Sequence, residues 1–120
     1  MSVHALSTTI VIDCADPAAL AAFYRTATGW DVISSDAEYA ALGDGGPVRI
    51  AFQRVAGHRA PDWPADPARA HLDLTVRDVG STVAELLAAG AGKPGFQPGE
   101  DSWVVLTDPE GHPFCLAAAE

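Results

Sequence analysis

The sequence predicts an α+β protein of 120 residues in which one strand–helix–strand–strand–strand module occurs twice. Matching segments reveal the repetition. Thr9 and His71 lie at corresponding positions in two strand-like stretches, and Asp16 and Asp78 follow these stretches, so that both pairs are 62 residues apart. Repetition of half a chain at a constant offset is typical of a duplicated supersecondary unit. We therefore expect corresponding residues of the two modules to occupy corresponding places in the fold.

The first module follows from the hydrophobic pattern. Residues 8–14 alternate with a period of two, as in a half-buried strand. Asp16 then provides an N-cap, Pro17 suits the first helical position, and apolar residues recur at helical spacing until Gly29 ends the helix. Between turn-forming residues, three further strands are expected at 30–33, 39–42 and 48–55.

The second module repeats the order of elements. It follows a segment with three prolines and a glycine but no periodicity, which predicts a linker. Its strand, helix and three strands are expected at 70–76, 79–89, 92–96, 102–107 and 113–118. A chain of this length can form one core but not two independent ones. We therefore expect a single domain over 1–120, with module one at about 7–55, the linker at about 56–69 and module two at about 70–118.

Charge and composition exclude several classes of function. A formal charge of −9 and a pI near 4.6 disfavour nucleic acid and anionic membranes as partners, because either would need a basic surface. No segment has the length and hydrophobicity of a membrane span or a secretory signal, so we expect a cytoplasmic protein. Cys14 and Cys115 lie in apolar strand-like runs and suggest neither a disulfide framework nor a zinc motif.

One strand of the second module separates polar from apolar side chains sharply. His71, Asp73 and Thr75 alternate with three aliphatic residues. The aliphatic face must pack on the following helix, so the polar face is expected to look into a cleft. His71 and Asp73 are candidates for acid and base catalysis there. The residues expected to contact a ligand are Thr9, Asp13, Arg49, Gln53, Thr75, Trp103 and Cys115.

A structural interpretation competes with the catalytic one. A lone strand histidine is often a hydrogen-bonded scaffold residue, and Asp73 would then pair with Arg25, Arg49 or Arg77. The strand rise separates His71 and Asp73 by about 7 Å, close enough to share a water or a substrate. Both interpretations stay open on the sequence alone.

Several motifs resemble one protein superfamily. They are the segments Asp-Pro-Ala-Ala-Leu-Ala-Ala-Phe-Tyr at 16–24, His-Leu-Asp-Leu-Thr-Val-Arg-Asp at 71–78 and Thr-Asp-Pro-Glu-Gly-His-Pro-Phe at 107–114. The chain resembles the vicinal oxygen chelate superfamily, and within it the glyoxalase-like branch of the glyoxalase, bleomycin resistance and dioxygenase group. The resemblance implies paired βαβββ modules that assemble as a homodimer.

The resemblance also implies where a metal would bind. Metal-dependent members use His or Glu from the first and fourth strands of each module, which correspond here to Thr9, Ala51, His71 and Cys115. A one-residue shift would replace Ala51 by Ile50, and neither can bind a metal. A catalytic site needs three or four nitrogen or oxygen donors. We therefore expect no catalytic metal and no cofactor.

These observations leave three functions in order of preference. The first is binding of a small apolar or aromatic molecule in a sheet-lined cleft, without a catalytic metal. The alternative is a metal-independent lyase or isomerase that uses His71 and Asp73 as acid and base. Metal-dependent glyoxalase or dioxygenase chemistry comes third. Whether the protein is an enzyme therefore stays open on the sequence alone, because this superfamily includes both enzymes and binding proteins.

Overall fold

The computed structural model describes residues 5–66 and 70–119, in two compact units. The first unit comprises Met1–Arg25 and Gly29–Arg59, and the second comprises Thr26–Thr28 and Ala60–Glu120. Part of the expected linker, residues 67–69, lies outside the described residues. Within the described residues, no helix combines the length and hydrophobicity needed to cross a membrane.

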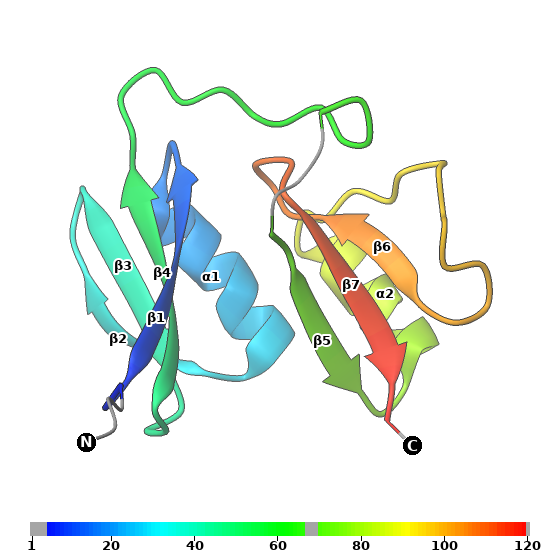
Figure 1. Ribbon diagram of the computed structural model, residues 1–120, viewed down its shortest axis with the longest axis horizontal. Helices are drawn as coiled ribbons and strands as arrows, with labels where there is room; N and C mark the ends of the chain where they lie inside the picture. The colour runs from blue at the N-terminus through cyan, green and yellow to red at the C-terminus, as the bar shows by residue number, and fades with distance from the viewer. Residues whose placement is uncertain (1–4, 67–69, 120) are drawn as a thin grey trace. The chain divides into compact units, whose positions relative to one another are not determined.

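The first unit is a four-stranded mixed sheet with a helix (Figure 1). Its elements are β1 (Thr8–Cys14), α1 (Pro17–Thr28), β2 (Asp31–Ser35), β3 (Tyr39–Gly43) and β4 (Val48–Arg54). The strand order is β1-β4-β3-β2, with β1 parallel to β4 and the other pairs antiparallel. The predicted order of strand, helix and three strands is confirmed for this unit.

Helix α1 begins and ends where the sequence predicts. The side chain of Asp16 accepts a hydrogen bond from the Ala19 N–H at 3.2 Å, and Pro17 occupies the first turn, where its missing N–H costs nothing. At the other end Gly29 adopts φ 72°, and its N–H donates to the Arg25 carbonyl at 2.8 Å. This left-handed conformation strains residues with a Cβ, which explains the glycine.

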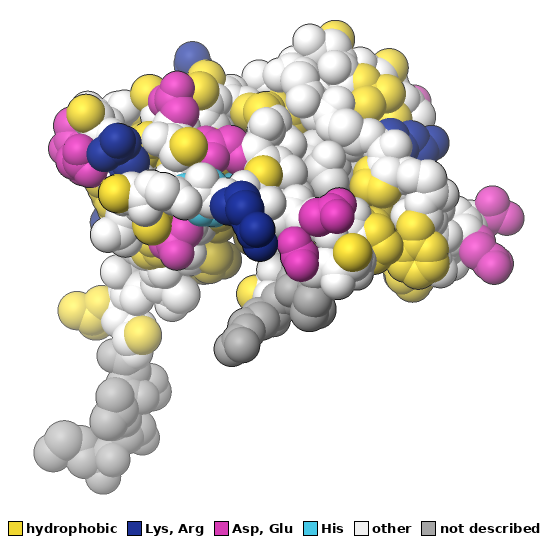
Figure 2. Space-filling view, turned by 90° about the horizontal axis from the view of Figure 1, so that it is seen from above, with side chains coloured by type: hydrophobic (Ala, Val, Ile, Leu, Met, Phe, Trp, Pro, Cys, Tyr) yellow, Lys and Arg dark blue, Asp and Glu magenta, His cyan; other side chains and the backbone are white. Residues whose placement is uncertain are grey.

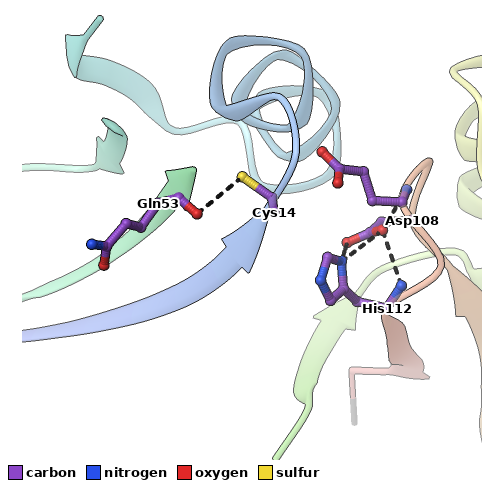
Figure 3. Close-up of polar contacts among 5 residues, drawn as sticks. Cys14, Gln53, Asp108 and His112 are labelled. Atoms are coloured by element: carbon purple, nitrogen blue, oxygen red, sulfur yellow. Dashed lines mark hydrogen bonds and ion pairs between the residues drawn. The ribbon is translucent and has the colours of Figure 1, made fainter. Parts of the chain in front are cut away.

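The core of the first unit assigns the two faces of its sheet. The Phe52 ring of β4 stacks on Tyr24 of α1 with centroids 5.2 Å apart, and both side chains are fully buried. The even-numbered residues of β4 therefore face the helix. Cys14 at the end of β1 is also buried, and its thiol donates to the Gln53 carbonyl at 3.6 Å (Figure 3). The odd-numbered residues of β4, Arg49 among them, lie on the opposite face.

The second unit has a smaller sheet than predicted. Its elements are β5 (Leu72–Val76), α2 (Val79–Ala88), β6 (Val104–Thr107) and β7 (Pro113–Ala118). They form a three-stranded sheet in the order β5-β7-β6, with α2 behind it in Figure 1. Helix α2 begins at the predicted position, where the Asp78 side chain accepts from the Ser81 N–H at 3.2 Å.

The strand expected at 92–96 is wrong, because this segment makes only one isolated bridge, from Gly92 to Thr107. Pro94 lacks the N–H that a continuing ladder needs. A side chain takes over instead: the Gln97 amide donates to the Val105 carbonyl and accepts from the Val105 N–H, both at 2.9 Å. Gln97 therefore satisfies the backbone of β6 where a fourth strand would have paired with it.

The turn before β7 is held by a buried carboxylate. The Asp108 side chain has 0% exposure and accepts from the Glu110 N–H at 2.8 Å and the His112 N–H at 3.1 Å. The His112 ring nitrogen Nδ1 lies 2.8 Å from its second oxygen (Figure 3). These contacts give Asp108 and His112 a structural role in the turn.

Candidate functional site

Strand register in the second unit brings three polar side chains together. His71 immediately precedes β5, and the period of two places it on the same sheet face as Asp73 and Thr75. In the parallel pairing of β5 with β7, Asp73 lies opposite Cys115, which in turn lies opposite Val105 of β6. Phe114 directly precedes Cys115 in sequence, so its side chain lies on the reverse face of the sheet, where it is fully buried. The polar face therefore carries the site.

A pocket of about 620 Å³ lies over this face of the sheet. The described residues that line the pocket all belong to the second unit. Its polar lining consists of His71, Asp73, Thr75, Ser102 and Cys115. Its apolar lining consists of Trp63, Pro98, Trp103, Val105, Pro113 and Ala117. Ligand pockets in proteins commonly have volumes of about 300–1,000 Å³ and apolar walls with a few polar groups, as here.

His71 and Asp73 are in direct contact. Imidazole Nε2 lies 3.0 Å from Asp73 Oδ1, although the strand rise alone predicts a much wider separation. The two side chains lean toward each other over the sheet, which closes the gap. Both are accessible, with 46% of the His71 side chain and 74% of the Asp73 side chain exposed. This is an open pair on the pocket floor, and among the described residues of the second unit Asp73 forms its ion pair with His71 rather than with Arg77.

Cys115 is the second partner of Asp73. Burial raises the pKa of the Cys115 thiol above its ordinary value of 9.0, and the negative charge of Asp73 and a hydrogen bond to its carboxylate raise it further. At neutral pH Cys115 is therefore a thiol that donates to Asp73. We call His71, Asp73 and Cys115 the polar cluster.

The polar cluster is also the group of side chains that could hold a metal. Its three donor atoms lie within 4.8 Å of one another. A nitrogen, an oxygen and a sulfur suit a borderline-soft ion such as zinc, but the thiol would first have to lose its proton. The raised pKa of Cys115 opposes that step. The absence of a catalytic metal stays a prediction, and these contacts favour it.

The register of the first unit identifies the corresponding positions there. Val11 lies opposite Ala51 in the β1–β4 pairing, just as Asp73 lies opposite Cys115 in the β5–β7 pairing. The one-residue ambiguity between Ala51 and Ile50 is thereby resolved, because Ile50 shares the helix-facing side with Phe52. Where the second unit has His, Asp and Cys, the first has Thr9, Val11 and Ala51, which offer no charged donor.

Four residues predicted to contact a ligand belong to the first unit. Thr9, Asp13, Arg49 and Gln53 are exposed and share the sheet face that points away from α1, as their pairings Thr9 with Arg49 and Asp13 with Gln53 require. The pocket is lined by the second unit alone, so these four are not among its lining residues. Their part in ligand binding stays a prediction.

Sequence reasoning missed part of the pocket wall. Pro113 and Ala117 share a face with Cys115, and extending the alternation of β7 through all its residues would have identified them. Pro98 and Ser102 come from irregular segments, where no periodicity indicates the direction of a side chain. Only a structure could place these two at the pocket.

The module order, the helix-backed sheets and the pocket on the opposite sheet face define a protein of the vicinal oxygen chelate superfamily. The model of the family described as "Glyoxalase-like domain" matches residues 9–117. The chain belongs to this family. A comparison with curated proteins gave no match.

Solved structures share the fold at low sequence identity. A glyoxalase/bleomycin resistance protein/dioxygenase family enzyme from Burkholderia phytofirmans PsJN is 21% identical with a TM-score of 0.70, over 93% of this chain and 97% of that one. A glyoxalase-related enzyme from Fulvimarina pelagi is 22% identical with a TM-score of 0.68, over 93% and 86%. The bleomycin-binding protein from Streptomyces verticillus, complexed with copper(II)-bleomycin, is 18% identical with a TM-score of 0.63, over 99% and 100%.

Proposed function

We propose that the protein binds a small apolar or aromatic molecule in the pocket of its second unit and acts by binding it. One observation carries the proposal: an accessible pocket of about 620 Å³ combines two indole rings, of Trp63 and Trp103, with a compact polar cluster. Apolar walls provide affinity, and a few polar groups fix orientation. A structural relative complexed with copper(II)-bleomycin supports small-molecule binding by this fold.

The test is a thermal-shift screen with aromatic compounds, because a ligand that binds the native state raises the melting temperature by mass action. An Ala117→Trp variant should abolish the shift, because Ala117 lines the pocket and a larger side chain would fill it. Ala119→Trp is the matched control, since Ala119 is exposed just beyond β7 and does not line the pocket. Equal shifts in both variants would contradict binding at this site.

A second candidate function is metal-independent lyase or isomerase chemistry. The 3.0 Å contact between His71 and Asp73 favours it, because an oriented histidine at a pocket surface can exchange protons with a bound molecule. It ranks second because such reactions develop negative charge, and the described lining holds no Lys or Arg to stabilise it. Turnover that His71→Ala abolishes while affinity is retained would reverse the ranking.

Assembly as a cytoplasmic homodimer is part of the same proposal. Strand β1 ends the order of its sheet, and Ile10 and Val11 on it are exposed. An edge strand with exposed aliphatic side chains is usually covered. A solution mass near 12.4 kDa by light scattering at micromolar concentration would show a monomer and contradict the dimer.

A further inference from the structure

We propose that the ligand of this pocket is an organic cation, with a protonated or quaternary amine that meets Asp73 and an aromatic or apolar body that meets Trp63 and Trp103. The inference rests on the proposed function and narrows its ligand class. Anions are excluded as ligands, and neutral molecules are expected to bind with lower affinity than cations of the same shape.

The charge of the lining is the first argument. Of the described residues that line the pocket, Asp73 is the one acidic residue, and none is Lys or Arg. His71 and the Cys115 thiol both contact Asp73. The Cys115 thiol is a neutral donor, so its hydrogen bond leaves the negative charge of the carboxylate in place. The pocket therefore presents a fixed anion and no permanent cation.

The accessibility of Asp73 is the second argument. Its side chain is 74% exposed, so water solvates the carboxylate when the pocket is empty. A neutral ligand that filled the pocket would remove this water without replacing its interactions, which costs free energy. An anionic ligand would add repulsion. A cationic group restores the lost interactions and forms a charge-assisted hydrogen bond, as a protonated amine does with a carboxylate.

The two indoles are the third argument, because aromatic faces attract cations and apolar bodies alike. Each indole ring packs against a neighbouring residue. Trp63 contacts Phe96 with centroids 5.6 Å apart. Trp103 lies so close to Gly99 that a Cβ there would be 2.5 Å from its ring, so the glycine makes room for the indole. Aromatic walls beside a carboxylate are typical of sites that bind organic ammonium ions.

The electrostatic surroundings point the same way. Residues 60–66 and 70–119 contain nine Asp and Glu but only two Lys and Arg. Glu100 and Asp101 lie in the loop between Pro98 and Ser102, two residues that line the pocket. On the surface seen in Figure 2, acidic and basic side chains are both scattered among apolar ones. The excess of acidic residues in this unit produces a negative electrostatic field, which attracts cations and repels anions.

The experiment compares ligands that share an aromatic skeleton and differ in the charge of the terminal group. Three aromatic skeletons, phenyl, indol-3-yl and naphthyl, are each tested as the arylethylamine, the arylethanol and the arylpropionate, by calorimetry at low salt. We expect at least one arylethylamine to bind about fivefold or more tightly than its alcohol, the sum of an exposed ion pair and a cation–π contact. The propionates should bind weakest, and added salt should reduce the preference.

Two variants assign the preference to Asp73. Asp73→Asn keeps the shape of the side chain and removes its charge, and should reduce the preference for the amine to the part that the cation–π contact provides. Glu85→Gln removes one charge from the exposed face of α2, away from the pocket lining, and should retain the preference. As an independent readout, the pKa of Cys115 should be lower with a bound arylethylamine than with the matching arylethanol, because both ligands bury the thiol and only the amine offsets the Asp73 charge.

The possible failures separate the two proposals. The proposal of a cationic ligand would be overturned if the native protein bound the amine and the alcohol equally well, or bound a propionate more tightly. The proposed binding function would stand in either case. A preference of undiminished size in Asp73→Asn would also overturn the proposal of a cationic ligand. Failure of all nine compounds to bind would overturn both proposals together.

Discussion

Two carboxylates of the second unit, each paired with a histidine, should differ widely in their effect on stability. Asp73 has a side chain 74% exposed, whereas the side chain of Asp108 has 0% exposure. Exposed ion pairs contribute about 0–1 kcal/mol to the free energy of unfolding. We therefore expect Asp73→Ala and His71→Ala each to lower it by less than about 1 kcal/mol.

Asp108→Ala should be far more costly. It leaves the N–H groups of Glu110 and His112 and the His112 ring without the carboxylate that accepts from them. Each buried donor left unsatisfied costs about 1–3 kcal/mol, so we expect a total loss of about 3 kcal/mol or more.

Urea melts of the three variants and the native protein provide the measurement, with the midpoint and the slope fitted separately. A loss of about 2 kcal/mol or more from either His71→Ala or Asp73→Ala would refute the reasoning. The polar cluster would then be part of the scaffold, and ligand affinity in these variants would be nearly unchanged.

Three further predictions concern the same unit. Alkylation of Cys115 followed by peptide mass spectrometry should have a midpoint above pH 9.0, and Asp73→Asn should lower it. As pH rises, the thiol ionises at a lower pH in the unfolded chain than in the folded protein. The contribution of Cys115 to stability is therefore complete below about pH 9 and is lost as pH rises through the raised pKa. An alkylation midpoint below pH 9.0 would contradict this prediction. Gln97→Ala should cost about 1–3 kcal/mol, because it leaves both backbone groups of Val105 unpaired, whereas a loss below about 0.5 kcal/mol would show that water replaces the amide. Elemental analysis after growth with added metals should find less than one equivalent of zinc, nickel, iron or manganese, and a full equivalent lost in His71→Ala would establish a metal site.

The sequence predicts most of the fold because its signals are local. The strands predicted in 8–14 and 71–76 and the caps at Asp16 and Asp78 are confirmed by the structure. The prediction of a strand at 92–96 is wrong because the Gln97 side chain, and not a backbone strand, forms hydrogen bonds with β6. No pattern of hydrophobicity reveals such a substitution.

The candidate site is predicted less completely than the fold. Period two places His71 and Asp73 on one face, and the structure agrees. Their direct contact depends on side-chain rotamers, which strand geometry does not specify. Trp63 lies in a segment without periodicity, so its place in the pocket depends on tertiary packing. The residues of the first unit were predicted from the two faces of their own strands, and their contact with a ligand stays untested.

The protein's three tryptophans allow the most direct test of the central claim. Trp63 and Trp103 line the pocket, whereas Trp30 belongs to the first unit and is not among the lining residues. In a ¹⁵N-labelled sample each indole N–H gives one NMR signal, which can be assigned by single Trp→Phe substitutions. On titration with the tightest-binding arylethylamine, the account predicts saturable shifts of the Trp63 and Trp103 signals and an unchanged Trp30 signal. A saturable shift of Trp30 alone, with Trp63 and Trp103 unaffected, would show that the ligand binds elsewhere and would contradict the account.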